Sequence, residues 1–387
     1  MTRVLHLVTT LNRGGIEMWL LNMIRELHGT IFTLDVCCKG DELGVLATDA
    51  AAMGATVHQC TLRADHVRYA HCLSRLLRDG GYDILHNHLE LHSGLPVWVA
   101  HRVGVPVITS FHNTSFPPQT RTTKRPGMRQ LRGAYGRASI AYALRHSDVV
   151  TGCSKGVLQS LGLCEQDRGK GSTEVLYYGV DTVAEPTETE RADFRASLSI
   201  PVESPLIVHV GRFVEQKNHH GILNVFQRVL AERSDGYLLL VGDGPMRRQV
   251  ESEVTNRGLQ DRVRFLGIRA DAQWVMNLCD IFLFPSKHEG FGLAALEANA
   301  AGLPVVGSRI PGLMEAVEDG CTALLHALDD ETGMAASVGS LLRDDSRRRQ
   351  FALAGRARVE RKFTTLQSAK RSAHLYDSLP MITRKGR

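Results

Sequence analysis

The chain has 387 residues, of which 43% are hydrophobic and 22% charged, and its formal net charge is +5. This length is sufficient for two domains with separate cores, and the composition is typical of a globular protein. No run of 18 apolar residues occurs, which argues against a transmembrane helix. The first residues begin a strand without the apolar core of a signal peptide, so we expect a cytoplasmic protein.

The eight cysteines are scattered along the chain and form no C-x-x-C pair. Several lie in apolar surroundings, as buried free thiols do in a reducing compartment. We therefore expect free thiols and no zinc site.

The N-terminal segment combines a strand, a Gly-Gly loop and a helix. A β-rich run over residues 4–8 precedes Gly14 and Gly15, and apolar residues at helical spacing follow over residues 16–27. Such a loop can bring backbone N–H groups close to a phosphate, with Arg13 as a further candidate. The G-x-G-x-x-G of a dinucleotide fold is absent, and a plain tight turn explains the glycines equally well.

Strands then alternate with helices. We expect strands over residues 33–38, 56–60, 83–86, 106–111 and 148–154, and helices over residues 41–53, 67–78, 95–102 and 138–145. This alternation with short loops predicts a doubly wound parallel sheet, in which ligands bind at the carboxyl ends of the strands.

Histidines follow two of these strands. His86, His88 and His92 could ligate a metal, but Glu90 is the one acid nearby and the chain contains no D-x-D triplet. Polar side chains that line a cleft are the favoured interpretation. His112 ends an apolar strand, where either a ligand contact or a structural role is possible.

One block of the chain is basic without any acid. No Asp or Glu occurs from Leu91 to Ser147, a segment with eight Arg and Lys residues, five of them within residues 121–132. A block of one sign indicates an anionic partner. Nucleic acid is disfavoured because the aromatic spacing of a stacking platform is missing. An anionic membrane surface, contacted from Arg121 to Arg137, or a phosphorylated acceptor fits better.

The alternation of strands and helices begins again in the second half, after a segment of linker composition at residues 183–190. A strand over residues 205–210 leads into a loop with Arg212 and Lys217, and a helix is expected over residues 220–231. A planar guanidinium and a point-charge ammonium suit a diphosphate, although surface bases are the plainer alternative. Further strands are expected over residues 237–241, 262–267 and 281–284, with a helix over residues 271–277.

Two glutamates follow the last of these strands. Glu289 lies in a turn with Gly290 and Gly292, and Glu297 lies inside the helix expected over residues 293–301. Carboxylates at such a junction suit hydroxyl-rich ligands, because each accepts several hydrogen bonds. A capped helix with surface acids is the simpler alternative, but it would not need glycines on both sides of Phe291.

Glu289-Gly290-Phe291-Gly292-Leu293 with Glu297 resembles the paired-glutamate signature of family 4, the retaining glycosyltransferases of the GT-B group, which includes enzymes of bacterial exopolysaccharide and capsule synthesis. Arg212 and Lys217 match the spacing of that family's donor-diphosphate pair. The resemblance implies two Rossmann-like domains facing a cleft: residues 1–180 on the acceptor side, residues 181–363 for the nucleotide-sugar, and a crossover helix with a basic tail over residues 364–387.

The resemblance also implies the roles of the site residues. Arg212, Lys217 and the Gly15 amide would stabilise charge on the donor diphosphate, so that no metal or other cofactor is needed. Glu289 would hold sugar hydroxyls and Glu297 the ribose. The remaining donor contacts would come from His112 and from the backbone amides of Phe291, Gly292 and Leu293.

The implied reaction moves a sugar from a nucleotide diphosphate, most simply a UDP-sugar, to an acceptor hydroxyl with retention. The acid-free block favours a lipid-linked or polysaccharide acceptor, with peripheral contact to the inner face of the membrane. A soluble natural-product or aminocyclitol acceptor is the alternative. Two other classes stay open, a GT-B nucleotide-sugar 2-epimerase and a non-catalytic subunit.

Overall fold

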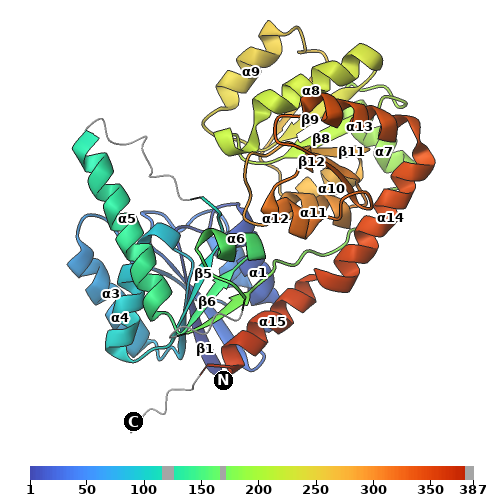
Figure 1. The fold of residues 1–387 in the computed structure, drawn as a ribbon. Coiled ribbons are helices and arrows are strands. Elements are labelled where there is room, and N and C mark those ends of the chain that lie inside the picture. Colours follow the sequence, from blue (N-terminus) through green and yellow to red (C-terminus); the bar gives the residue numbers. More distant parts are fainter. Residues whose placement is uncertain (116–125, 166–170, 380–387) are drawn as a thin grey trace. The chain divides into compact units, whose positions relative to one another are not determined.

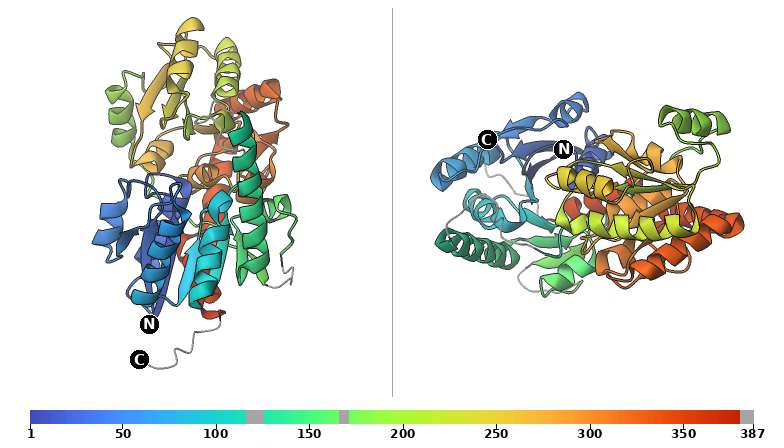
Figure 2. Two further views of the ribbon diagram at one scale, coloured as in Figure 1. Left: turned by 90° about the vertical axis from the view of Figure 1, so that its left-hand side faces the viewer. Right: turned by 90° about the horizontal axis from the view of Figure 1, so that it is seen from above.

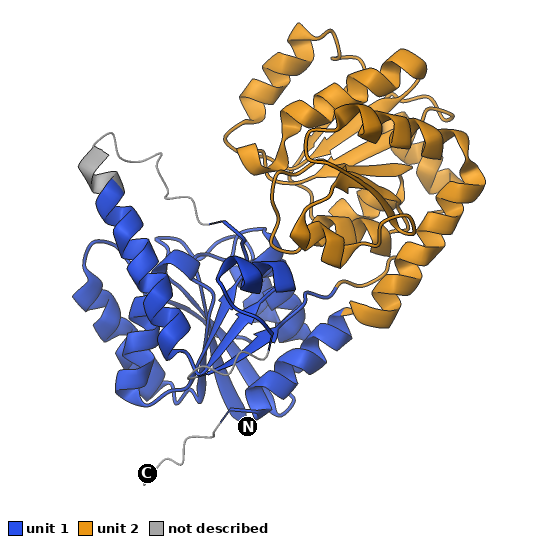
Figure 3. Cartoon of the chain, viewed as in Figure 1, with its two compact units in different colours: residues 1–179, 365–387 blue, residues 180–364 orange. Residues whose placement is uncertain are grey.

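The computed structural model describes residues 1–115, 126–165 and 171–379. The chain divides into two compact units (Figure 3). The first unit contains residues 1–179 and 365–387, and the second contains residues 180–364.

The first unit is built on a seven-stranded parallel sheet of order β3-β2-β1-β4-β5-β6-β7 (Figure 1). Its central strands β1 and β5 are largely buried, as expected for a parallel sheet covered on both faces. The strands are β1 (Thr2–Val8), β2 (Phe32–Cys38), β3 (Val57–Gln59), β4 (Ile84–Asn87), β5 (Val107–Phe111), β6 (Val149–Gly152) and β7 (Ser172–Val175).

Helices cover both faces of this sheet. In Figure 1, α3, α4 and α5 lie on one face, while α1 and α15 lie on the other, and Figure 2 shows α5 standing alongside α4. The helices are α1 (Gly15–Leu27), α2 (Ala47–Ala52), α3 (His66–Asp79), the 3₁₀ turn η1 (Glu90–His92), α4 (Gly94–Val103), α5 (Pro126–His146), α6 (Lys155–Ser160) and α15 (Thr365–Asp377).

The last helix is held in the first unit by a polar contact inside the core. Trp19 on α1 donates from Nε1 to Ser368 Oγ on α15 at 2.9 Å, and both residues are buried. The same hydroxyl donates to the carbonyl of Tyr177 at 2.9 Å. One serine therefore joins the first and last helices of the unit to the segment after β7.

The second unit repeats the architecture with a six-stranded parallel sheet of order β10-β9-β8-β11-β12-β13. The doubly wound prediction is confirmed for both halves of the chain. The strands are β8 (Leu206–Val210), β9 (Tyr237–Val241), β10 (Val263–Gly267), β11 (Ile281–Phe284), β12 (Val305–Ser308) and β13 (Ala323–His326).

Two sets of helices sandwich the second sheet, with α8, α9 and α13 on one face and α10, α11, α12 and α14 on the other (Figure 1). The helices are α7 (Glu188–Ser197), the 3₁₀ turn η2 (Glu215–Lys217), α8 (His219–Glu232), α9 (Arg247–Asn256), α10 (Ala272–Asn277), α11 (Leu293–Ala300), α12 (Pro311–Ala316), α13 (Glu331–Arg343) and α14 (Asp345–Lys362).

Two sequence-based boundaries are wrong. The helix expected over residues 41–53 is reduced to α2, because Gly44 adopts a φ of 98° and the loop before it hydrogen-bonds Leu11 instead. The linker expected over residues 183–190 ends earlier, because Thr187 and Glu190 form a reciprocal capping box that starts α7.

The expectation of free thiols is wrong at one pair. Cys60, after β3, and Cys72, on α3, form a disulfide. The remaining six cysteines form no disulfide: Cys37, Cys38, Cys153 and Cys279 are buried, and Cys164 and Cys321 are exposed.

The basic segment is described in part. Residues 116–125 lie outside the described ranges, and the helix expected from residue 138 begins earlier, at Pro126, as α5. Among the described residues, none of the helices has both the length and the apolar character needed to cross a bilayer.

Removing the Ser368 hydroxyl should destabilise the first unit. Ser368→Ala leaves the buried Trp19 N–H without this acceptor, which costs about 1–3 kcal/mol. Urea unfolding of the full chain measures the loss. Ser378→Ala is the matched control, since the hydroxyl of this exposed serine donates to the nearby Leu375 carbonyl on the same helix end. Equal midpoints for the two variants would contradict the assigned role of Ser368.

Candidate active site

The strand order of each sheet reverses once, between β8 and β11 in the second unit and between β1 and β4 in the first. At such a point the two following loops diverge and leave a crevice at the carboxyl edge, where open α/β sheets bind ligands. In the second unit the two loops carry Arg212, Lys217 and Glu289.

Lys217 and Glu289 form an ion pair across this crevice. Lys217 Nζ lies 2.6 Å from Glu289 Oε1, and the two side chains are 15% and 9% exposed. The ammonium also lies 4.9 Å from the centre of the Phe284 ring, a cation–π distance. The structure thus brings together two residues that the sequence analysis selected independently.

Hydrogen bonds between the two loops fix the positions of this pair. Lys287 N–H donates to the Gln216 carbonyl at 2.8 Å, and Gln216 Nε2 donates to the His288 carbonyl at 2.8 Å. Asn218 Nδ2 donates to the Pro285 carbonyl at 3.1 Å. Backbone and amide contacts therefore join the two loops, alongside the ion pairs Lys217–Glu289 and Lys287–Glu215.

Arg212 lies at the start of the same loop with its side chain exposed. No hydrogen bond or ion pair of its guanidinium occurs among the described residues of the second unit. An arginine that the protein itself does not engage keeps all five donors for a ligand.

The loop after β11 brings backbone N–H groups to the same edge. Phe291 is buried against Phe363, with ring centres 5.6 Å apart, and Gly292 adopts a φ of 79° as the N-cap of α11. Gly292 provides no side-chain cap for the N–H groups of Leu293 and Ala294, whereas the N–H of Ala295 donates to the Gly292 carbonyl at 2.9 Å.

Glu297 lies one turn into α11. Burial raises the pKa of its carboxyl to about 7, and the positive charge of Lys217 acts in the opposite direction. Near neutral pH this group is therefore present both as an acid, which can donate a hydrogen bond, and as a carboxylate.

Further polar atoms at this edge were missed by the sequence analysis. Three buried atoms have no hydrogen-bond partner within the part of the chain that the structure describes: His209 Nε2 at the end of β8, Ser286 Oγ after β11 and Ser308 Oγ on β12. Unsatisfied buried polar groups are rare, and three at one edge indicate a site that binds water or a ligand. Serine and histidine at strand ends are the sequence signal that could have identified them.

In the first unit, the Gly-Gly loop leads from β1 into α1. The helix begins at Gly15, its N-cap Gly14 provides no side chain, and Arg13 is exposed. Glu17, which the sequence analysis missed, folds towards this loop: a Cβ at residue 14 would lie 2.5 Å from Glu17 Oε2. Burial raises the Glu17 pKa to about 7.

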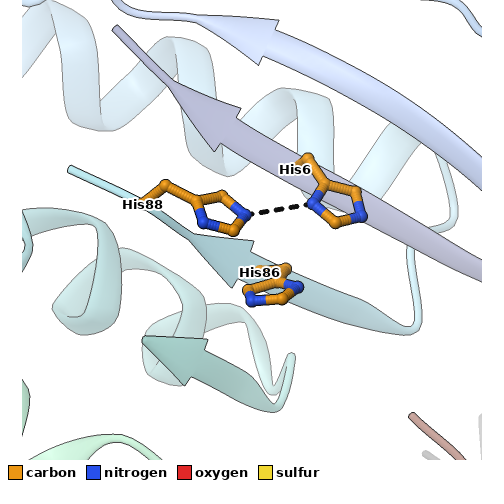
Figure 4. Close-up of side chains that lie close together, drawn as sticks. All are labelled: His6, His86 and His88. Atoms are coloured by element: carbon orange, nitrogen blue, oxygen red, sulfur yellow. Dashed lines mark hydrogen bonds between the residues drawn. The ribbon is translucent and has the colours of Figure 1, made fainter. Parts of the chain in front are cut away.

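A cluster of buried histidines lies beside this loop (Figure 4). It contains His86 and His88 from the predicted group, together with His6 inside β1 in place of His92. Their ring nitrogens lie within 4.8 Å of one another, close enough to consider a metal ion. His6 was missed because a lone histidine within an apolar strand carries no motif.

His112 has both ring nitrogens engaged within the first unit. Nε2 lies 3.0 Å from His88 Nδ1, and Nδ1 hydrogen-bonds the Tyr178 hydroxyl. Its backbone N–H donates to Glu90 Oε1 at 3.0 Å. The Glu90 backbone has a φ of 49°, and its carboxylate also accepts from Asn113 Nδ2. The strand-end position of His112 is as expected, but its ring is fully hydrogen-bonded.

Two family models match the chain. "Glycosyl transferase 4-like domain" covers residues 14–165, and "Glycosyl transferases group 1" covers residues 190–358. Together they cover β2 to β6 of the first sheet, all six strands of the second sheet and the loops after β8 and β11.

Similarity to known proteins agrees with the two family models. The chain is 27% identical over 291 residues to N-acetyl-alpha-D-glucosaminyl L-malate synthase of Bacillus anthracis, covering 73% of this chain and 71% of the relative. It is 34% identical over 170 residues to the lipopolysaccharide core biosynthesis glycosyltransferase LpsD of Rhizobium meliloti, covering 44% and 48%. Anabaena HepE in complex with UDP-glucose has the same fold, with a TM-score of 0.82, 20% identity and coverage of 98% and 100%.

Two parallel-sheet units with loops of this kind define a GT-B glycosyltransferase. The chain belongs to family 4 of these enzymes, as its signature suggested.

The buried histidines should make the protein sensitive to acid. Burial lowers the pKa of His6 and His112 to about 3, and those of His86 and His88 well below 6.5. Below pH 6.5 the unfolded chain therefore binds protons that the folded chain does not. Stability falls as pH decreases, by up to about 1.4 kcal/mol per histidine per pH unit.

Carboxyls with raised pKa values act in the opposite sense, but they are fewer. Glu17, Glu90 and Glu297 take up protons in the folded state, whereas eight histidines have lowered pKa values, with His58, His92, His209 and His219 joining the four above. We expect a lower urea midpoint at pH 5.5 than at pH 7.5. The control His71→Asn should leave the difference between these two midpoints unchanged. A midpoint that does not change with pH would contradict burial of neutral imidazoles.

Proposed function

We propose that this glycosyltransferase moves a sugar from a UDP-sugar to an acceptor hydroxyl with retention of configuration. The observation that carries the proposal is the Lys217–Glu289 pair at the crevice of the second sheet, with Arg212 exposed on the same loop. This combination offers both a cation for a diphosphate and a carboxylate for sugar hydroxyls. HepE crystallises with UDP-glucose, which favours uridine as the base.

Departure of the sugar leaves negative charge on the β-phosphate. Arg212 and Lys217, with the Gly15 amide, would stabilise that charge as it develops, which lowers the barrier. Two cations and a helix N-terminus make a metal unnecessary, and the departing phosphate would take the acceptor proton. No carboxylate then needs to act as nucleophile.

Hydroxyl recognition falls to the loop after β11. Glu289 would accept from the sugar hydroxyls, Glu297 would bind the ribose, and the amides of Phe291, Gly292 and Leu293 would bind the donor sugar. Lys217 would exchange Glu289 for phosphate as the donor enters, which frees the carboxylate for the sugar. His112 would contact the sugar from the first unit through a group other than its occupied ring nitrogens, or by releasing one of them.

Each unit would have its own task. We assign residues 1–180 to the acceptor side and residues 181–363 to the nucleotide-sugar, with residues 364–387 as crossover helix and tail. This division follows the family resemblance and the separate loops that each sheet presents.

For the acceptor we favour a lipid-linked or polysaccharide intermediate of a bacterial surface. The acid-free block around α5 supports this choice, as does similarity to a lipopolysaccharide core enzyme. Similarity to a synthase whose name specifies L-malate keeps a small soluble acceptor as the second candidate.

Vesicle flotation tests peripheral membrane contact. Anionic vesicles should carry the full chain at low salt and release it at high salt, because the attraction between basic residues and lipid headgroups is screened. Neutral vesicles are the control. A protein that stays in the soluble fraction with anionic vesicles at low salt would favour the soluble acceptor.

A thermal-shift panel of UDP, GDP and ADP tests the donor site. A ligand that binds the folded state raises the melting temperature, so UDP should raise it, with or without Mg²⁺. Arg212→Ala should weaken UDP binding about 10- to 100-fold through loss of charged hydrogen bonds. Arg228→Ala, an exposed arginine about 2.5 turns along α8, should leave binding unchanged. Absence of a shift with all three nucleotides would contradict the proposal.

Glu289→Gln tests the sugar contact. The amide keeps the size of the side chain but loses the charge, so kcat/KM for transfer should fall about 10- to 100-fold while UDP affinity changes little. Glu215→Gln, an exposed carboxylate on the facing loop, should change kcat/KM less than about twofold. Transfer by Glu289→Gln at the unaltered rate would exclude a role for this carboxylate. Product detection also separates transfer from 2-epimerisation and from an inactive subunit.

A further inference from the structure

Imidazole rings form a continuous hydrogen-bonded chain through the core of the first unit. His6 Nδ1 lies 3.1 Å from His88 Nε2, and the two ring planes differ by 8° (Figure 4). Their ring centres are 5.4 Å apart, so the difference of 2.3 Å (5.4 minus 3.1) is about twice the distance from the centre of an imidazole to its nitrogen. The two nitrogens therefore point straight at each other.

The next contact repeats this geometry. His88 Nδ1 lies 3.0 Å from His112 Nε2, with ring centres 5.2 Å apart and planes 27° apart. The difference of 2.2 Å (5.2 minus 3.0) again places both nitrogens close to the line between the rings. The chain ends in this direction at Tyr178, whose hydroxyl meets His112 Nδ1.

The chain continues from the other side of His6 through Tyr376 on α15. The Tyr376 hydroxyl lies 3.3 Å from His6 Nε2 and 3.0 Å from His86 Nδ1. His86 Nε2 in turn lies 2.7 Å from Ser110 Oγ. Every ring nitrogen of the four histidines is thus occupied.

This geometry does not favour a metal ion. Zinc-bound imidazoles direct their lone pairs to a common point about 2.0–2.1 Å from each nitrogen, so two such ligands do not face each other along one line. His6 and His88 do face each other, and the nitrogens of His86 are directed at Tyr376 and Ser110.

The proton order of such a chain follows from counting donors. A neutral imidazole has one N–H donor and one acceptor nitrogen, and a tyrosine hydroxyl has one proton. If Tyr376 donates to His86 Nδ1, then His6 must donate to Tyr376 from Nε2, and the remaining bonds are fixed in turn. All four histidines then carry their proton on Nε2. If Tyr376 donates to His6 instead, all four carry it on Nδ1.

We infer that His6, His86 and His88 are positioning residues that share one tautomer with His112 and determine which of its nitrogens carries the proton. Moving the proton of one ring to its other nitrogen requires every ring to do the same, because a mixed arrangement places two donors or two acceptors face to face or leaves the buried Tyr376 proton without an acceptor among these rings. The orientation of His112 at the end of β5 is therefore set from α15 at the other end of the chain. Only the link from His112 to the sugar rests on the proposed function.

Nitrogen NMR of the full chain tests the tautomers. Long-range proton–nitrogen spectra of histidine-labelled protein at pH 7.5 distinguish a protonated from an unprotonated ring nitrogen. We expect His6, His86, His88 and His112 to be neutral and all of one tautomer, whereas the exposed His71 should show a mixture. Mixed tautomers among the four, or a charged ring, would overturn the inference. Stoichiometric metal in the purified protein would do so as well.

Tyr376→Phe tests the coupling with a minimal change. Loss of the hydroxyl cuts the chain between His6 and His86, so the tautomer of His86 should no longer follow that of the other three. Tyr142→Phe on α5 is the control and should leave all four signals in place. Unchanged signals in Tyr376→Phe would overturn the coupling.

Kinetics separate positioning from the donor site. Tyr376→Phe should lower kcat for sugar transfer severalfold and leave UDP affinity unchanged, because every member of the histidine chain belongs to the first unit, whereas Arg212 and Lys217 belong to the second. Unchanged kcat beside altered tautomers would refute the link to His112 while the proton order stands. Failure of UDP to bind the unaltered protein would refute the proposed function and leave the NMR result intact.

Discussion

The strand order of a doubly wound sheet must reverse once, and the location of the polar residues follows from that constraint. On either side of the reversal the chain leaves the sheet towards opposite faces, so the loops part and expose backbone groups at the carboxyl edge. In the second unit these loops follow β8 and β11, and they carry the Lys217–Glu289 pair. In the first unit the corresponding strands are β1, which carries His6, and β4, which carries His86 and is followed at once by His88.

The second unit places charged groups at this edge, and these groups differ in how far they are exposed to water. Lys217 and Glu289 are mostly buried but paired, which offsets the cost of removing each charge from water. Arg212 is exposed and keeps its hydration until a ligand replaces it. A site with one charge pair and one solvated cation suits a dianionic group: under the proposed function, phosphate would take over Lys217 and Glu289 would turn to hydroxyls.

Local signals predicted much of this unit. The strands at residues 237–241 and 281–284 were placed correctly, because short apolar runs bounded by Gly or Pro have few other interpretations. Arg212, Lys217 and Glu289 were selected because they lie in loops that follow such strands and match the family's spacing, and their roles stay predictions. Helix ends were harder: Gly44 breaks a helical pattern through its positive φ, and the Thr187–Glu190 capping box starts a helix inside polar sequence.

The histidine chain could not be predicted in the same way. Its members are distant in sequence, with His6 and Tyr376 separated by 370 positions, and no short motif connects them. Cys60 and Cys72 posed a similar problem, since a bridge depends on the distance between two elements rather than on spacing along the chain. Contacts between distant elements are determined by packing, which a single sequence does not display.

The two units therefore place different chemistry near the point where the strand order reverses, an ion pair in the second unit and neutral imidazoles in the first. A charge buried as deeply as His88 would need a partner of opposite charge, whereas neutral imidazoles satisfy one another, each as donor and acceptor at once. Such a chain is rigid, because each ring holds the orientation of the next. Under the proposed function, such a chain would hold His112 in one orientation, while the second unit would exchange its ion pair for a ligand.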